Sequence, residues 1–160
     1  MPPRLRPLTK REIVAYVAGS IEHYSQERVA AGETPDEALR VAQEQINRSF
    51  PEGIPADGQY IFRVLDDDEL EVGVIWIGVL SMDRPNAFWV YDVEIDELHR
   101  GRGLGRAAMA LAEDEARARG ATELGLNVFG HNLIAKHLYE SMGYETTATR
   151  MRRILKKEGL

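Results

Sequence analysis

The stretch Arg100-Gly101-Arg102-Gly103-Leu104-Gly105-Arg106 decides how this sequence is interpreted. It lies between a strand predicted over residues 87–96 and a helix predicted over residues 107–119. Its three glycines stand at alternate positions and leave the backbone unshielded, so several N–H groups can converge on an anion at the start of the helix. The three arginines add positive charge beside them. The pattern predicts a diphosphate-binding loop, and the alternative is a tight turn with solubilising arginines.

Two common phosphate-binding loops do not match this stretch. A Walker loop ends in Gly-Lys-Ser/Thr, whereas Arg106 and Ala107 follow Gly105 here. The dinucleotide fingerprint Gly-x-Gly-x-x-Gly would place its third glycine where Arg106 stands, and it expects a parallel strand in front. The sequence therefore disfavours a nicotinamide dehydrogenase.

The hydrophobic pattern on either side of the loop predicts an α/β fold. Three strands joined by short turns precede the loop as an antiparallel meander: residues 60–65, 70–80 and 87–96. A strand, a helix and a last strand follow its helix: residues 122–129, 132–142 and 144–155. The unbroken apolar run at residues 72–77 indicates a strand covered on both faces.

Two further helices are predicted before the meander. Each begins with a capping box, in which a threonine and a glutamate three residues later satisfy free amides: Thr9–Glu12 and Thr34–Glu37. A short strand at residues 4–8 precedes them. No repeat, linker or low-complexity segment interrupts the chain, so we expect one domain over residues 1–160.

Composition excludes several classes of protein. The 160 residues include no cysteine, which excludes disulfides, thiol catalysis and cysteine-bound zinc. No apolar run reaches the roughly 18 residues of a membrane span, and the N-terminus lacks the apolar core of a signal peptide. We therefore expect an intracellular, cytoplasmic enzyme or binding module without a membrane partner.

The net charge of −6 is unevenly distributed along the chain. Residues 1–80 hold 14 acidic and 8 basic residues, whereas residues 81–160 hold 12 of each. This balance disfavours nucleic acid as a partner, because that binding depends on a basic face that neutralises phosphates. The acidic half suits a cationic partner, and the alternative is that its surface acids only keep the protein soluble. The second half holds the predicted anion site.

The loop resembles the Arg/Gln-x-x-Gly-x-Gly/Ala signature of the GNAT superfamily of acetyl-CoA-dependent N-acyltransferases, matched here by Arg100 to Gly105. Three more segments resemble the family in the same order: residues 92–95, 126–132 and 138–144. The resemblance implies the GNAT fold, a mixed and mostly antiparallel sheet of six or seven strands with splayed central parallel strands and about four helices. Residues 1–56 would supply an N-terminal strand and the acceptor-side helices, and residues 57–160 the sheet and the acetyl-CoA-binding core.

The same resemblance implies where acetyl-CoA binds. The strand with Val93 and Ile95 splays from the strand with Asn127, and the pantetheine arm lies in the gap. The amides of residues 101–106 hold the pyrophosphate, Asn132 reaches the pantetheine arm, and Tyr139 stands near the sulfur. The implied acetyl-CoA-binding residues are Val93, Ile95, Arg100, Gly101, Arg102, Gly103, Leu104, Gly105, Arg106, Asn127, Asn132 and Tyr139.

Direct acetyl transfer to an amine needs a neutral nitrogen, donors on the thioester oxygen and an acid for the leaving thiolate. Tyr139 is the predicted acid, because a phenol of pKa about 10 holds its proton at pH 7. Without the resemblance, Tyr139 would be interpreted as a core residue of an amphipathic helix. Glu94 is the first candidate for the base and Asp92 the second, with bulk water and a backbone carbonyl as the alternative. A strand amide near Ile95 is the expected oxyanion donor.

We therefore predict an N-acetyltransferase that acts on a primary amine. The acceptor is a small amine, a peptide N-terminus or a lysine, and we expect it to be cationic. The alternative is a non-catalytic acyl-CoA-binding module, which needs the loop but not Tyr139. No metal is expected, since His131 and His137 are six residues apart and do not share a helical face. The sequence leaves open whether the chain forms a homodimer.

Overall fold

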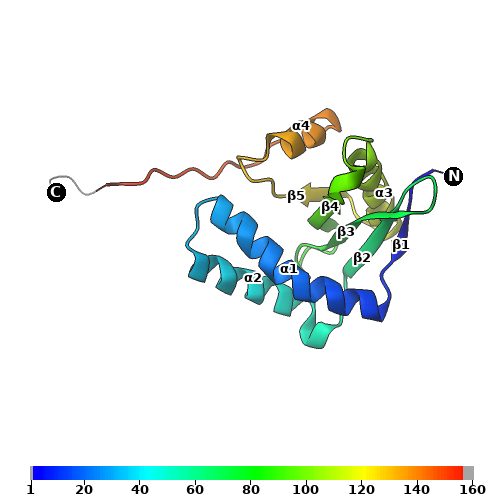
Figure 1. Cartoon of the computed structure of the whole chain (residues 1–160), viewed down its shortest axis with the longest axis horizontal. Coiled ribbons are helices and arrows are strands. Elements are labelled where there is room, and N and C mark those ends of the chain that lie inside the picture. The colour runs from blue at the N-terminus through cyan, green and yellow to red at the C-terminus, as the bar shows by residue number, and fades with distance from the viewer. Residues whose placement is uncertain (1, 157–160) are drawn as a thin grey trace.

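The computed structural model describes residues 2–156, and its elements follow the predicted order as far as the fourth helix (Figure 1). The elements in chain order are β1 (Arg4–Pro7), α1 (Lys10–Ala30), α2 (Pro35–Ser49), β2 (Gln59–Leu65), β3 (Glu71–Val79), β4 (Ala87–Ile95), α3 (Leu104–Ala118), β5 (Glu123–Leu126) and α4 (Leu133–Ser141). Short 3-10 helices precede β2 and follow β4. None of the described helices is long and apolar enough to cross a membrane.

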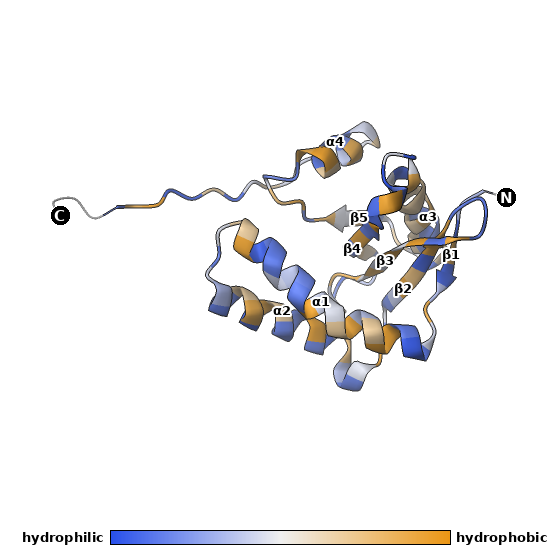
Figure 2. Ribbon diagram, in the orientation of Figure 1, coloured by the Kyte–Doolittle hydropathy of each residue, from blue (hydrophilic) through white to orange (hydrophobic). Residues whose placement is uncertain are grey.

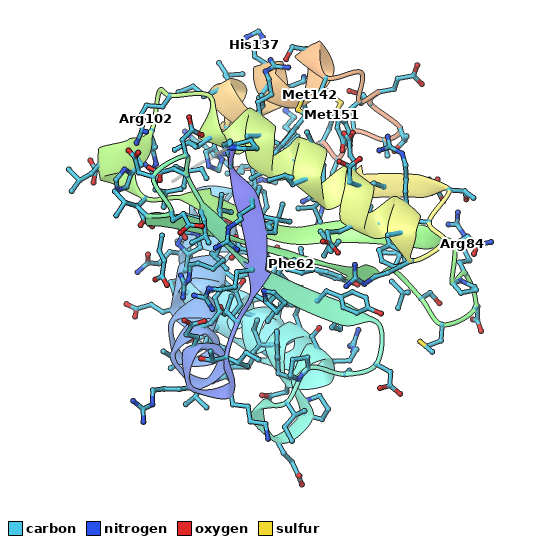
Figure 3. All side chains as sticks on the ribbon, turned by 90° about the vertical axis from the view of Figure 1, so that its right-hand side faces the viewer. Phe62, Arg84, Arg102, His137, Met142 and Met151 are labelled. Carbon is cyan, nitrogen blue, oxygen red and sulfur yellow. The ribbon has the colours of Figure 1, made fainter. Side chains whose placement is uncertain are left out.

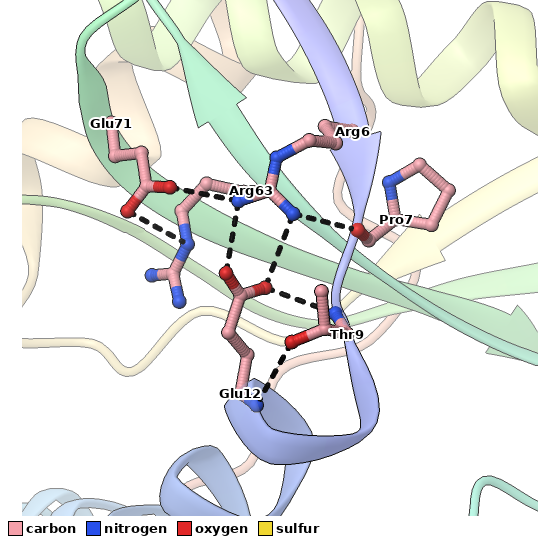
Figure 4. Close-up of polar contacts among 6 residues, drawn as sticks. All are labelled: Arg6, Pro7, Thr9, Glu12, Arg63 and Glu71. Carbon is pink, nitrogen blue, oxygen red and sulfur yellow. Dashed lines mark hydrogen bonds and ion pairs between the residues drawn. The ribbon is translucent and has the colours of Figure 1, made fainter.

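A network of polar side chains joins the start of α1 to the sheet (Figure 4). The Thr9 hydroxyl accepts a hydrogen bond from the Glu12 amide, and the Glu12 carboxylate accepts one from the Thr9 amide at 3.0 Å. Arg6 of β1 donates to Glu12 at 3.0 Å and to Glu71 of β3 at 2.8 Å. The Arg6 hydrogen bond holds the pKa of Glu12 below its usual value. The predicted capping box at Thr9 is confirmed, and it fixes the first helix against the sheet.

The five strands form one sheet in the order β1-β2-β3-β4-β5. The first four pair antiparallel, as the meander predicts, and β4 pairs with β5 in parallel. Opposite β3, Trp76 pairs with Asp92 and Ile77 with Val90, so Tyr91 is an extra residue that bulges from β4. The parallel pairing runs only from Ala87–Glu123 to Val90–Leu126. Beyond that point the two strands have no ladder between them.

Helices cover both faces of the sheet (Figure 2). The α3 face holds a buried cluster that includes Phe62, Ile75 and Met109, with Leu104 and three alanines four residues apart on the buried side of the helix. The opposite face packs α1 and α2 against a second cluster that includes Phe50 and Trp76. The predicted two-sided burial of β3 is confirmed, since residues 72–78 are buried.

Two predictions about the second half are corrected by the structure. The helix predicted from residue 107 begins at Leu104, because Gly103 adopts a left-handed conformation (φ 77°) and serves as the N-cap. The last strand, predicted over residues 144–155, is wrong: residues 145–156 contain neither helix nor strand. Among the described residues the sheet therefore has five strands, not six or seven. A strand requires a neighbour for its backbone groups, and residues 145–156 extend away from the rest of the chain (Figure 1).

Candidate active site

The glycine loop presents a row of free backbone donors. Gly101 and Gly103 both have φ of 77°, and a Cβ built on either would meet no atom within 4 Å. Within residues 2–156, the amides of residues 101–106 donate to no acceptor, and Ala107 is the first amide of α3 to bond, to the carbonyl of Gly103 at 3.1 Å. Free amides at a helix N-terminus attract anions because they carry its positive dipole. The loop thus has the donors and the open space that a pyrophosphate requires.

The three arginines of the loop are each held by another part of the chain. Arg100 donates from Nε to the Ile95 carbonyl at 2.8 Å, at the end of β4. Arg106 donates to the Ser141 hydroxyl at 2.5 Å and so joins α3 to the end of α4. Arg102, labelled in Figure 3, places its guanidinium 3.5 Å from the buried carboxylate of Asp66, which belongs to the turn between β2 and β3. The backbone hydrogen bond from Leu70 is the largest cause that lowers the pKa of Asp66.

The gap between β4 and β5 opens beside this loop. Val93 and Ile95 lie on β4 past its last pair with β5, and both pack against the α3-side core. Asn127 directly follows β5 on the other side of the gap, and it borders the hollows on both sides of the sheet. The structure therefore brings Val93, Ile95 and Asn127 to one place, which is next to the free amides of residues 101–106.

A groove of about 860 Å³ lies on the α1–α2 face of the sheet and reaches this gap at Asn127. Its aromatic wall is built on Trp76, which stacks on Tyr91 with ring centroids 4.6 Å apart. The Trp76 indole donates to Gln59 at 2.8 Å, and the Tyr91 hydroxyl donates to the Val79 carbonyl at 2.8 Å. These bonds fix the rings, so the groove has a rigid apolar side.

Carboxylates gather at the end of the groove that faces the gap. The Tyr16 hydroxyl of α1 donates to Asp92 Oδ2 at 2.6 Å. Burial is the largest cause that raises the pKa of Asp92, and it raises the pKa of Tyr16 well above the usual value. The imidazole of His23 lies 4.0 Å from Glu94 and 3.6 Å from Glu27. Burial and these carboxylates make this end of the groove suited to a cation.

Tyr139 and Asn132 belong to α4, on the β5 side of the gap. The Tyr139 ring packs edge-on against Tyr144, with centroids 6.0 Å apart, and its hydroxyl bonds to no described residue. Burial raises the pKa of Tyr139, and the charges of Asp92 and Glu27 raise it further. The Asn132 side chain accepts from the Ala135 amide at 3.2 Å and caps α4.

Sequence reasoning missed the contribution of α1 to this site. Tyr16, His23 and Glu27 line the groove, yet the sequence analysis assigned no site residue to that helix. The apolar side chains of Ile13, Val17 and Ile21 pack against the cluster under the helix. Positions 16, 20, 23 and 27 follow helical spacing and form a second, polar stripe beside the apolar one. The helical spacing of these polar residues is visible in the sequence. The sequence does not show that this side of the helix lines a groove.

Metal ligands do not gather in this part of the chain. Residues 2–156 hold no group of three or more histidine, aspartate or glutamate side chains that could bind a metal ion.

Comparisons with known proteins point to one family. Residues 21–144 match the sequence profile described as "Acetyltransferase (GNAT) family". The uncharacterized N-acetyltransferase YdgE of Bacillus subtilis (strain 168) is 28% identical over 152 residues, which cover 94% of this chain and 97% of YdgE. The crystal structure of YycN from Bacillus subtilis is 28% identical, with a TM-score of 0.87 over 97% of this chain and 99% of that one. AAC(6')-Iy, solved with the bisubstrate analog CoA-S-monomethyl-acetylneamine, shares the fold at 15% identity, with a TM-score of 0.57 over 98% of this chain and 100% of that one.

Proposed function

The chain belongs to the GNAT acetyltransferase family and is an acetyl-CoA-dependent acyltransferase, and we propose that it acetylates a cationic primary amine bound in the groove between α1 and β4. The observation that carries this proposal is the position of Glu27, Asp92 and Glu94 at the end of the groove that meets the gap between β4 and β5. An amine held there would face a thioester held in the gap. The rigid aromatic wall would contact the rest of the acceptor.

The residues on the other side of the gap fit acetyl-CoA. The amides of residues 101–106 would bind its pyrophosphate, because they are the free donors at the start of α3. The backbone of residues 93–95 has no strand partner on the β5 side and would pair with the amide groups of the pantetheine arm. Asn127 borders both hollows, and Tyr139 lines the one beside β5. Asn132, the N-cap of α4, would reach the pantetheine arm from the start of that helix.

The charge of the groove supports a cationic acceptor. Its lining includes four carboxylates, Glu27, Asp57, Asp92 and Glu94, against one arginine, Arg48, and the imidazole of His23. Among these carboxylates, Asp92 is fixed by Tyr16, whereas Glu94 has no hydrogen-bond donor fixed on it. We therefore assign Asp92 to binding of the ammonium group and Glu94 to removal of its proton.

The proposed transfer assigns an acceptor to each proton. The ammonium first loses a proton to Glu94, which passes it to water. The neutral nitrogen attacks the thioester carbon, the C–N bond forms and the C–S bond breaks. The leaving thiolate takes the proton of Tyr139, and the second proton of the nitrogen replaces it. The products are an amide, the CoA thiol and one released proton.

A thiol-release assay tests the proposal directly, because the chain has no cysteine and every thiol detected comes from CoA. We expect release that requires an added amine, with diamines ahead of amines that carry an anionic group. Glu94→Gln should lower turnover by about 10²-fold or more, as expected for loss of a general base. Glu22→Gln, a change on α1 outside the groove, should not. CoA binding without thiol release from any amine would identify a binding module instead.

A further inference from the structure

Asp66 is the only charged residue that is buried among the residues that the structure describes, and the proposed function does not use it. It lies in the turn between β2 and β3, and its side chain is 1% exposed. A buried carboxylate loses the hydration of its charge, so it stays ionised only where neighbouring groups compensate for that loss. The groups around Asp66 therefore indicate its role.

One oxygen of Asp66 completes the turn. Oδ1 accepts hydrogen bonds from the backbone amides of Asp68 at 2.9 Å and Leu70 at 3.0 Å. The bond from Leu70 is the largest cause that lowers the pKa of Asp66, so its carboxyl group is ionised at neutral pH. An asparagine could accept both bonds through its side-chain oxygen, as it does in Asx turns. The turn by itself therefore requires an acceptor at this position, but not a charge.

The second oxygen of Asp66 faces the glycine loop. Oδ2 is buried and accepts no hydrogen bond from residues 2–156. A guanidinium nitrogen of Arg102, in the loop, lies 3.5 Å from it, and the other terminal nitrogen lies 3.2 Å from His99 Nδ1. Arg102 (labelled in Figure 3) thus joins the loop to the turn between β2 and β3 and to the 3-10 helix after β4.

The middle of the loop depends on this contact. Among residues 101–103, only Arg102 has a side chain that can hold the segment in place, because Gly101 and Gly103 have none. Both glycines hold φ of 77°. Glycine loses more backbone freedom on being fixed than any other residue, so this segment does not keep one conformation through its own preference. The contact between Arg102 and Asp66 therefore anchors the middle of the loop.

Attraction of the ligand does not explain Asp66. A carboxylate beside a phosphate site repels the anion, and Arg102 would be freer to bind a phosphate without it. The arrangement fits preorganisation instead. A loop that is fixed before binding loses less conformational freedom when the ligand binds. The amides of residues 101–106, which donate to no described acceptor, are the groups whose positions this anchor fixes.

We propose that Asp66 is a positioning residue for acetyl-CoA: its buried carboxylate holds the guanidinium of Arg102 and so fixes residues 101–103 in the conformation that binds the pyrophosphate. This role depends on the proposed binding of acetyl-CoA by the loop. Asp66 touches neither the substrates nor the reacting atoms. It therefore affects the binding of acetyl-CoA and not the chemical step.

Calorimetric titration of the Asp66→Asn protein with CoA tests this role. The variant keeps an acceptor for the two turn amides, but its NH₂ group cannot pair with the Arg102 guanidinium. We expect CoA affinity to fall by about 5- to 10-fold, as for loss of a partly buried ion pair. KM for acetyl-CoA should rise by the same factor, while kcat at saturating acetyl-CoA and KM for the amine stay the same. Asp68→Asn, the same change at an exposed position of the turn, should leave CoA affinity unchanged.

Variants of Arg102 show whether Asp66 acts through this side chain. Arg102→Met removes the guanidinium from a side chain that is 48% exposed, and it should weaken CoA binding at least as much as Asp66→Asn. Adding Asp66→Asn to Arg102→Met should cause no further loss, because the partner is already absent. Arg102→Lys keeps a positive charge and should recover part of the affinity. Thermal unfolding without CoA verifies that each variant is folded, and Asp66→Ser, which also keeps an acceptor for the turn, is a second neutral variant.

Gly103→Ala distinguishes a failure of this role from a failure of the proposed function. If Gly103→Ala weakens CoA binding and the folded Asp66 variants do not, the loop binds CoA but Asp66 does not position it. If none of these variants weakens binding, the loop does not hold the pyrophosphate and both proposals are wrong. Losses that add in the double variant would show that Asp66 acts independently of Arg102, and tighter binding by Asp66→Asn would show that it competes with the phosphates for Arg102. Either result would overturn the positioning role.

Discussion

The glycine loop and the groove that we propose for the acceptor both border the gap between β4 and β5, and they are built in different ways. The loop is a run of consecutive residues whose donors are backbone amides, and its conformation depends on left-handed glycines such as Gly101. The groove is made by side chains that come from distant parts of the chain, as the bond between Tyr16 and Asp92 shows. A backbone site is sensitive to changes of conformation, whereas a side-chain site is sensitive to changes of functional group.

The largest effect is expected where the two regions meet, at Tyr139. Tyr139→Phe keeps the ring against Tyr144 and removes only the hydroxyl, which has no described partner. If this hydroxyl protonates the leaving thiolate, turnover should fall by about 10²–10⁴-fold while CoA affinity stays the same. Single-turnover kinetics and calorimetric titration with CoA measure the two quantities.

Tyr144→Phe is the matched control for this variant. Tyr144 is the neighbouring tyrosine, and its hydroxyl donates to Glu113 rather than facing the gap. Its loss should change stability more than turnover. A Tyr139→Phe enzyme as fast as the parent, with chemistry rate-limiting, would leave Tyr139 as a packing residue.

The second largest effect is expected in the loop. Gly103→Ala places a Cβ on a residue with φ of 77° and beside the free amides. We expect CoA affinity to fall by about 10- to 100-fold, because each hydrogen bond to a charged phosphate contributes about 1.5–3 kcal/mol. Calorimetric titration with CoA measures this change.

Gly120→Ala controls for backbone strain in the loop variant. Gly120 ends α3 with φ of 87° and also has open space around it, but it lies at the other end of the helix. Both variants should lose similar stability, about 1–2 kcal/mol for a left-handed alanine. Equal losses of CoA affinity in the two would contradict the phosphate role of the loop.

The difference between a loop built from consecutive backbone amides and a groove built from distant side chains explains what could be predicted from the sequence. The free amides of residues 101–106 depend on a local pattern of glycines before a helix, and this pattern is visible in the sequence. The three loop arginines are equally visible, but the partners of Arg102 and Arg106, Asp66 and Ser141, depend on tertiary contacts. The fold was predicted to the same extent: the meander and the four helices follow local periodicity.

Long-range features were predicted poorly for a physical reason. The polar stripe of α1 at Tyr16, His23 and Glu27 acquires its meaning only when the helix packs over Asp92 and Glu94. The hydrophobic pattern predicts a last strand over residues 144–155, yet a strand also needs a partner for its backbone groups. The sequence shows that residues 145–155 can form a strand. It does not show the direction in which the chain leaves α4, and that direction decides whether the segment meets a partner.

A third prediction separates stability from activity within the groove. Burial raises the pKa of Asp92 in the folded protein above the ordinary aspartate value of 3.8. Its contribution to stability is therefore fully present below the unfolded pKa and is lost as pH rises through the folded pKa. Asp92→Asn keeps an acceptor for Tyr16 and removes the buried charge. At neutral pH we expect the free energy of unfolding to rise by about 0.5–2 kcal/mol while activity falls.

Urea denaturation over a series of pH values measures this difference between parent and variant. The difference in the free energy of unfolding between variant and parent should be smallest in acid and increase as Asp92 ionises in the parent. Tyr16→Phe provides the converse control, because it removes the donor and keeps the charge, and it should lower stability at neutral pH. An Asp92→Asn variant that is less stable than the parent at neutral pH would show that the charge is well compensated.

The smallest effect is expected from long-range attraction of the acceptor. Of the 14 acidic residues in residues 1–80, only Glu27 and Asp57 appear among the described groove-lining residues, so the groove field comes from these two with Asp92 and Glu94. Charges of this kind steer a cation toward the groove, and salt weakens the attraction as the Debye length shrinks to about 8 Å at physiological ionic strength. At saturating acetyl-CoA we expect kcat/KM for a diamine to fall several-fold with added salt, and less for a monoamine.

Asp57→Asn, far from the proposed chemistry, should reduce the salt dependence without changing kcat, whereas Glu22→Gln should leave both unchanged. A diamine whose kcat/KM is independent of salt, or an amine with an anionic group that outcompetes it, would show that the acceptor is selected by shape rather than by charge.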